Sequence, residues 1–205
     1  QALMGDVRDR VMLDHQFAAI TEQEQAARHA SLHDVLTGLP NRVLFKDRLE
    51  HGIAQAKRHE WVLAVMFVDL DKFKSINDSH GHDVGDSVLK TVSHRLKDGT
   101  RSGDTVSRIG GDEFIYLMME IRDEASVAMV AGKIIDAIQA PMNISLSEPA
   151  FEVSIRASIG ISMFPKDGTT ADALITRADM AMYDAKQSKS GYAFAKYQSN
   201  ARHVR

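Results

Sequence analysis

The 205-residue sequence contains no cysteine, only four prolines and a single tryptophan. Without thiols the chain can form neither disulfide bonds nor thiolate zinc sites, which is typical of a reducing compartment. No apolar run approaches the roughly 18 residues that a membrane-spanning helix needs, and the first residues lack the pattern of a signal peptide. The formal net charge of −3 gives no general electrostatic reason to bind nucleic acid or an anionic membrane. We therefore expect a cytoplasmic domain without a nucleic-acid partner.

The length suits one domain, or one domain with an appendage, and the contents of 44% hydrophobic and 26% charged residues are ordinary for a globular protein. The appendage is expected at the N-terminal end, where a helical pattern extends to about residue 36. Its narrow stripe has 4-3-4-3 spacing, broken by one glutamate, and consists of Leu13, Phe17, Ile20, Glu24 and Ala27. Such a stripe predicts pairing with a second copy or another domain, although a helix folded back on its own domain fits equally well. Because the chain starts at Gln1, we expect a fragment of a longer protein.

Helix and strand patterns alternate along the rest of the chain. Apolar stripes predict helices over about 41–58, 83–96, 123–140 and 171–188, with a helical turn over 72–78. Strands are predicted over 61–70, 105–107, 114–118 and 151–159, followed by an edge strand over 192–197. This order predicts an α+β domain with a mixed central β-sheet and helices on one face of it.

The stretch from Arg108 to Phe114 contains two glycines followed by two acids. Gly110 and Gly111 lie between apolar strands and predict a hairpin turn, because glycine adopts positive φ without steric cost. The next two side chains, Asp112 and Glu113, repel each other unless a cation or solvent separates them. Uncovered backbone beside carboxylates suits a site for phosphate and metal, and a solvated hairpin is the alternative.

A second acidic pair follows the most apolar strand. Asp69 and Asp71 stand at the carboxyl end of the predicted strand 61–70, where open sheets bind their ligands. A central strand and a hairpin of one mixed sheet can bring these acids close to Asp112 and Glu113. Hard oxygen ligands of this kind favour Mg²⁺ together with a nucleotide phosphate.

Several motifs occur together and in one order, and through them the chain resembles a GGDEF domain, the catalytic domain of diguanylate cyclases. The motifs are Asp34-x-Leu36-Thr37-Gly38-Leu39-Pro40-Asn41-Arg42, Asp69-Leu70-Asp71-x-Phe73-Lys74-x-x-Asn77-Asp78, Gly81-His82-x-x-Gly85-Asp86, Arg108-x-Gly110-Gly111-Asp112-Glu113-Phe114, Ser158-x-Gly160 and Ala178-Asp179-x-Ala181-Met182-Tyr183-x-Ala185-Lys186. The resemblance covers about residue 31 to the C-terminus. It implies a core like that of nucleotide cyclase and polymerase palm domains over 31–205, preceded by a linker or signalling helix over 1–30.

The resemblance also implies ligands for Mg²⁺ or Mn²⁺. Asp69, the main-chain carbonyl of Leu70 and Asp112 resemble the metal ligands of the family. Glu113 either completes the shell of a second ion or helps to deprotonate the attacking hydroxyl. Lys74 resembles the residue that neutralises charge as pyrophosphate leaves.

Further resemblances concern the nucleotide. Asn77 and Asp86 resemble the guanine-reading residues, because an amide and a carboxylate match the acceptor and donors of the guanine edge. His82 is expected near the same pocket. The residues expected around the phosphates are Gly110, Gly111 and Lys186.

The phosphate motif departs from the family at one position. Ser190 stands where the family often has an arginine that holds the triphosphate. Lys189 can supply charge there, but without the forked geometry of a guanidinium. The reaction itself does not depend on this position, whereas the affinity for the triphosphate does.

The segment before the hairpin matches a regulatory motif of the family. Arg101 and Asp104 resemble the Arg-x-x-Asp inhibitory site, at which the product cyclic di-GMP binds. A guanidinium can pair bidentately with phosphate, and a carboxylate can accept from guanine N–H groups. Lys133 aligns loosely with a further basic contact, and an exposed salt bridge is the alternative reading of Arg101 and Asp104.

Together, these expectations describe a diguanylate cyclase that condenses two GTP into cyclic di-GMP and two pyrophosphates. Each domain of a homodimer would present one GTP, and the product would inhibit the enzyme. We expect an upstream sensor domain in the full-length protein, which can also be attached to a membrane. The alternative is a catalytically idle domain that acts as a receptor for cyclic di-GMP or GTP.

Overall fold

The computed structural model describes residues 20, 22–25, 27–145 and 150–196. The labelled helices are α2 (Arg42–His59), α3 (Phe73–His80), α4 (His82–Asp98), α5 (Glu124–Gln139) and α6 (Ala171–Ser188). The strands are β1 (Val62–Asp71), β2 (Thr105–Gly110), β3 (Glu113–Ile121), β4 (Met142–Ile144), β5 (Phe151–Val153), β6 (Arg156–Phe164) and β7 (Tyr192–Phe194).

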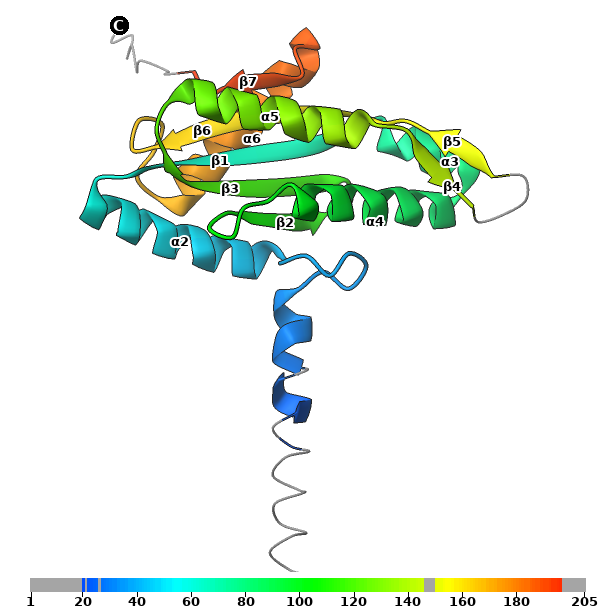
Figure 1. Ribbon diagram of the computed structural model, residues 1–205, viewed down its shortest axis with the longest axis horizontal. Helices are drawn as coiled ribbons and strands as arrows, with labels where there is room; N and C mark the ends of the chain where they lie inside the picture. The colour runs from blue at the N-terminus through cyan, green and yellow to red at the C-terminus, as the bar shows by residue number, and fades with distance from the viewer. Residues whose placement is uncertain (1–19, 21, 26, 146–149, 197–205) are drawn as a thin grey trace, which may run out of the picture.

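A five-stranded sheet forms the centre of the domain, in the order β2-β3-β1-β6-β7 (Figure 1). Its strands pair antiparallel, except for the parallel pair β6 and β7, so the sheet is mixed as predicted. β1 pairs with β3 on one side and with β6 on the other. Its buried apolar residues make it the middle of the sheet.

Helices pack on both faces of this sheet. On one face the β1 side chains Ala64, Met66 and Val68 join a core cluster with residues of α4 and α5. On the other face Val65 and Phe67 pack with residues of α2 and α6. The prediction of helices on a single face was wrong, because a strand as uniformly apolar as β1 must be covered on both sides.

The close approach of α6 to β6 requires a glycine. A Cβ atom on Gly160 would lie 1.9 Å from the carbonyl oxygen of Ala178 and 2.0 Å from the backbone nitrogen of Met182. Both atoms belong to the backbone of α6, so no side-chain rearrangement could make room. Gly160 thus lets α6 lie directly on the sheet, and the last turn of this helix reaches the carboxyl end of β1.

The predicted strand over 151–159 is two strands. β5 pairs with β4 in a separate two-stranded sheet, whereas β6 starts at Arg156 and enters the central sheet. The alternation of apolar residues continues across Ser154 and Ile155 and therefore does not reveal where the chain changes sheets. β4 is only three residues long, too short for a recognisable pattern.

The described N-terminal residues form a helix that ends at Leu32 and projects from the body of the domain (Figure 1). Ile20 is 53% exposed, and this part of the helix does not fold back on the domain. Leu13 and Phe17 lie outside the described residues. The helix ends before residue 36, because the Asp34 carboxylate accepts hydrogen bonds from the backbone and hydroxyl of Thr37 and so forms a turn.

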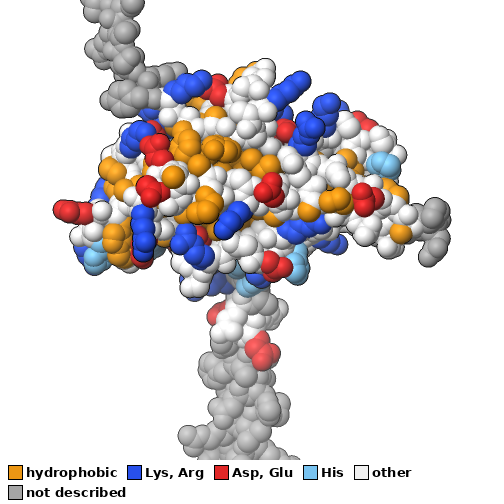
Figure 2. Space-filling view, turned by 45° about the horizontal axis from the view of Figure 1, so that its top comes forward, with side chains coloured by type: hydrophobic (Ala, Val, Ile, Leu, Met, Phe, Trp, Pro, Cys, Tyr) orange, Lys and Arg blue, Asp and Glu red, His pale blue; other side chains and the backbone are white. Residues whose placement is uncertain are grey.

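The surface is mixed in charge. Figure 2 shows Lys and Arg side chains interspersed with Asp and Glu over one face, around a patch of apolar side chains. Among the helices of the described ranges, none combines the length and the apolar character needed to cross a membrane.

Candidate active site

The turn between β2 and β3 is built on two glycines. Gly110 and Gly111 have φ angles of 154° and 52°, a region in which other residues are strained. The guanidinium of Arg108 donates from Nε and Nη2 to the carbonyl oxygen of Gly111, at 3.0 and 2.8 Å. The predicted hairpin is therefore present, and an arginine from its own first strand braces it.

Carboxylates from two strands meet beside this turn. Asp69 of β1 lies opposite Glu113 of β3 in the antiparallel register. The backbone nitrogen of Leu70 donates to the carbonyl oxygen of Asp112 at 3.2 Å. The structure thus brings together the two acidic stretches that the sequence places more than 40 residues apart.

The environment of Asp112 and Glu113 raises the pKa of both side chains. Burial raises the pKa of Asp112 above its ordinary value, and the charge of Asp69 adds to this effect. Burial also raises the pKa of Glu113, assisted by the negative charges of Asp179, Asp112 and Asp69. A bound cation would reverse this balance, because it stabilises the ionised carboxylates.

Lys186 contributes a positive charge from the last turn of α6. Its Nζ atom lies 2.5 Å from Oδ1 of Asp69. Burial alone would lower the pKa of Lys186, but the hydrogen bond and the charge of Asp69 outweigh this effect, and the pKa is raised. The lysine is therefore held in its charged form beside the carboxylates; a contact with phosphate stays a prediction.

The donor set suits a magnesium-type ion completed by substrate. Across the described ranges, no three His, Asp or Glu side chains converge to form a full binding cage. Mg²⁺ rarely uses such a cage, since it is commonly held by one or two carboxylates, waters and substrate phosphates. Asp69, Asp112 and the carbonyl of Leu70 offer a set of this kind.

The expected guanine-reading residues lie where α3 packs against α4. Oδ1 of Asn77 is buried and has no hydrogen-bond partner among the described residues. Asp86 and His82, both on α4, are exposed. A Cβ atom on Gly85 would lie 1.8 Å from Oδ1 of Asn77. The Asn77 oxygen is therefore turned into the contact between the two helices, where Gly85 leaves room for it.

The sequence predicted no separate function for Gly85 beyond its place in a motif. In the structure this residue makes the room that the Asn77 side chain occupies. The available signal was a glycine inside an amphipathic helix, which lowers helix stability and therefore tends to have a packing reason.

The comparison with known proteins decides the family. The family model described as "Diguanylate cyclase, GGDEF domain" matches residues 31–191. The chain belongs to this GGDEF family. The mixed sheet with flanking helices is accordingly the palm-like cyclase fold predicted from the sequence.

Two bacterial relatives illustrate the similarity. The bifunctional diguanylate cyclase/cyclic di-GMP phosphodiesterase MucR of Pseudomonas aeruginosa is 47% identical over 172 residues, covering 83% of this chain and 24% of MucR. The diguanylate cyclase TpbB of the same species is 40% identical over 174 residues, covering 85% of this chain and 39% of TpbB. The chain therefore spans 24% of the length of MucR and 39% of the length of TpbB.

Solved structures extend the comparison. The GGDEF domain of TpbB superposes with a TM-score of 0.76 at 41% identity, covering 80% of this chain and 94% of that domain. The coiled coil and GGDEF domain of DgcB from Caulobacter crescentus, in complex with c-di-GMP, has a TM-score of 0.83 over 95% of this chain and all of that one. At 23% identity, the likeness to DgcB is one of fold.

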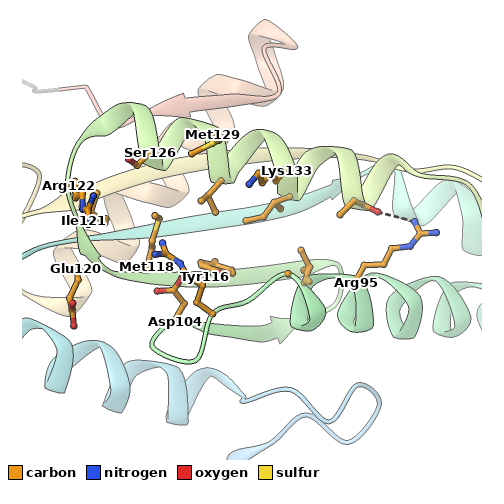
Figure 3. A pocket seen from close by; sticks show the side chains of 16 residues that line it. Arg95, Asp104, Tyr116, Met118, Glu120, Ile121, Arg122, Ser126, Met129 and Lys133 are labelled. Carbon is orange, nitrogen blue, oxygen red and sulfur yellow. Dashed lines mark hydrogen bonds and ion pairs between the residues drawn. The ribbon is translucent and has the colours of Figure 1, made fainter.

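The Arg101 and Asp104 pair of this GGDEF domain lies at a cavity of about 610 Å³ between α5 and β3 (Figure 3). The Asp104 side chain is only 4% exposed, and Arg101 is 65% exposed. Asp104 accepts hydrogen bonds from the hydroxyl of Tyr116 at 3.2 Å and the backbone nitrogen of Met119 at 2.9 Å. Nε of Arg101 lies 3.4 Å from Oδ2 of Asp104. Asp104 thus supports the strand as well as the pair.

The cavity has polar side chains on both walls. Tyr116 lies on the β3 wall and Lys133 on the α5 wall (Figure 3). Burial raises the pKa of Tyr116 to about 12, and the charge of Asp104 adds to this effect, so the hydroxyl keeps its proton. The loosely aligned Lys133 therefore lines the same cavity as Arg101 and Asp104.

Lys74 is bonded to neither carboxylate pair in the described ranges. It is exposed in the first turn of α3, and no hydrogen bond or ion pair joins its side chain to another residue in the described ranges. Its part in pyrophosphate departure stays a prediction.

Proposed function

We propose that this GGDEF domain is a diguanylate cyclase, which condenses two GTP into cyclic di-GMP and two pyrophosphates. The observation that carries the proposal is the meeting of Asp69, Asp112 and Glu113 at the ends of neighbouring strands, with Lys186 bonded to Asp69. The name of the relative TpbB, a diguanylate cyclase, supports the same reaction.

Each residue of the carboxylate cluster has a distinct role in this proposal. Asp69, Asp112 and the carbonyl of Leu70 would hold Mg²⁺ or Mn²⁺, which supplies positive charge beside the triphosphate when bound. Glu113 completes the shell of a second ion or accepts the proton of the attacking 3′-hydroxyl, a use that its raised pKa favours. Lys186 and Lys74 neutralise phosphate charge as pyrophosphate leaves.

Guanine is read at the junction of α3 and α4. The Asn77 side chain and the Asp86 carboxylate hydrogen-bond to the guanine edge, with His82 close by. The residue types support this assignment, because an amide and a carboxylate match the acceptor and the donors of the guanine edge. The backbone at Gly110 and Gly111 leaves space for the phosphates.

The product contains two phosphodiester bonds, so two domains must act together. Each GTP presents its 3′-hydroxyl to the α-phosphate of the GTP on the partner domain, and catalysis consists mostly of positioning and charge stabilisation. The projecting N-terminal helix pairs two copies and connects them to an upstream sensor domain. Product bound at Arg101 and Asp104 inhibits the enzyme.

The test is incubation of the purified chain with GTP and Mg²⁺, followed by chromatography for cyclic di-GMP. Asp112→Ala should abolish product formation, and Asp47→Ala on the exposed surface of α2 should not. A wild-type chain that binds GTP or cyclic di-GMP without forming product would instead be a receptor.

A further inference from the structure

A second cavity, of about 790 Å³, lies where the ends of β1 and β6 meet the last turn of α6. Four Lys or Arg side chains line it: Lys72, Arg156, Lys186 and Lys189. Among the described residues that line it, Asp71 is the only acid. A cavity with such an excess of positive charge attracts a polyanion.

Little of this charge is neutralised by the protein. Asp71 accepts a hydrogen bond from the Ser158 hydroxyl at 2.9 Å. The ammonium of Lys186 is bonded to Asp69. Within the described ranges, the side chains of Lys72, Arg156 and Lys189 form no ion pair.

The cavity adjoins the carboxylate cluster through Lys186, which lines the cavity and also contacts Asp69. In the register of β1 and β6, Asp69 lies opposite Ser158, and Asp71 lies opposite Arg156. Arg156 therefore stands two residues along the strand from the Asp69 position, or about 7 Å. The side chains of Asp69, Asp71 and Arg156 project from the same face of the sheet, because residues two apart on a strand, and residues opposite each other on paired strands, share a face.

We propose that Arg156, assisted by Lys189, binds the terminal phosphates of GTP and the departing pyrophosphate. This inference rests on the proposed cyclase function, in which the α-phosphate lies at the carboxylate cluster. Arg156 supplies from β6 the forked guanidinium that Ser190 does not provide, and such a fork pairs bidentately with phosphate. Lys189 adds a point charge from the end of α6.

The test compares ligands that differ in their phosphates. Calorimetry with Mg²⁺ would use the slowly reacting analogue guanosine 5′-O-(1-thiotriphosphate), inorganic pyrophosphate and GMP. Arg156→Gln should weaken the analogue and pyrophosphate about ten-fold, the effect of losing one charge-assisted contact, and should leave GMP unchanged. Arg156→Lys should fall between Gln and wild type. Arg58→Gln, an exposed arginine of α2, is the matched control.

Two results would overturn the inference. One is equal binding of pyrophosphate and the analogue by wild type and Arg156→Gln. The other is a loss that affects GMP as strongly as the analogue, which would indicate a structural role. A chain that shows the expected pattern but forms no cyclic di-GMP would contradict the proposed function alone. If the wild type forms cyclic di-GMP but Arg156→Gln leaves its affinity for pyrophosphate unchanged, only this inference would be contradicted.

Discussion

Adding one methyl group at Gly85 should abolish guanine selectivity without damaging the fold. In Gly85→Ala, the new Cβ would lie 1.8 Å from Oδ1 and 3.0 Å from Cγ of Asn77, and 3.2 Å from Cζ of Phe73. A carbon and an oxygen that are not bonded need roughly 3.3 Å. The Asn77 oxygen must therefore move by about 1.5 Å, and only a different rotamer of that side chain achieves this.

The magnitudes separate the effect on binding from the effect on stability. Displacing Asn77 removes its hydrogen bond to guanine and leaves a polar group of the base unpaired, which costs about 1–3 kcal/mol. This corresponds to about 5- to 150-fold weaker binding of GTP. The protein loses no hydrogen bond that it has, because Oδ1 of Asn77 has no partner among the described residues. Alanine in place of glycine inside a helix contributes up to about 1 kcal/mol of stability.

Calorimetry with the α-thio analogues of GTP and ATP, combined with thermal unfolding, measures both quantities. Gly85→Ala should bind the two nucleotides with similar, weak affinity and unfold at an unchanged or higher temperature. Gly132→Ala in α5 is the matched control, because among the described residues no atom outside the adjacent helix backbone lies within 4 Å of its added Cβ; it should leave binding intact. Unchanged GTP affinity in Gly85→Ala would refute the assignment of Asn77.

Three other predictions concern the carboxylates and the product site. Asp112→Asn should abolish turnover yet raise the unfolding midpoint of the metal-free protein by about 1–3 °C. The reason is that the raised pKa of Asp112 means that folding disfavours its ionised form. For a partly exposed group this destabilises the fold by at most about 1 kcal/mol. A lower midpoint would contradict this prediction. At subsaturating Mg²⁺, where the carboxylates are largely metal-free, turnover should fall on acidification at a higher pH than ordinary carboxylates would cause. The reason is that burial raises the pKa values of Asp112 and Glu113, and protonated carboxyls bind Mg²⁺ poorly. A pH–rate profile that stays flat down to the usual carboxyl range would exclude this. Arg101→Ala should require about ten-fold more cyclic di-GMP for inhibition, with little change in uninhibited rate; progress curves that slow equally in both proteins would leave Arg101 as a surface ion pair.

The motifs predicted the family and an apolar run predicted the central strand, because both kinds of pattern are local in the sequence. The uniformly apolar run ending at Asp69 marked β1 as the middle of the sheet, and the same uniformity already required helices on both faces. The sheet change at Ser154 was not predictable, because both strands keep the same alternation across it.

The contacts across the site depend on tertiary structure and were less predictable. Gly85 and Asn77 are eight residues apart, and their close approach depends on how α3 packs against α4. Arg156 looks like one polar member of an alternating strand, and only the register of β6 against β1 places it opposite Asp71. Register is set by the whole sheet, and no local pattern contains it.

A hydrogen-bonded chain links the N-terminal helix to the catalytic hairpin. The amide of Asn41 donates to the carbonyl oxygen of Ser31, in the last turn of that helix, at 2.8 Å. Nη1 of Arg108 donates to the Asp34 carboxylate at 2.9 and 3.1 Å, and the same guanidinium holds the carbonyl of Gly111. The helix end, the turn after it and the hairpin are therefore joined by one partly buried ion pair, between Arg108 and Asp34, and by hydrogen bonds on the surface. Because these contacts join the helix end to the hairpin that carries Asp112, we expect a rotation of the helix to be passed on to the carboxylate cluster.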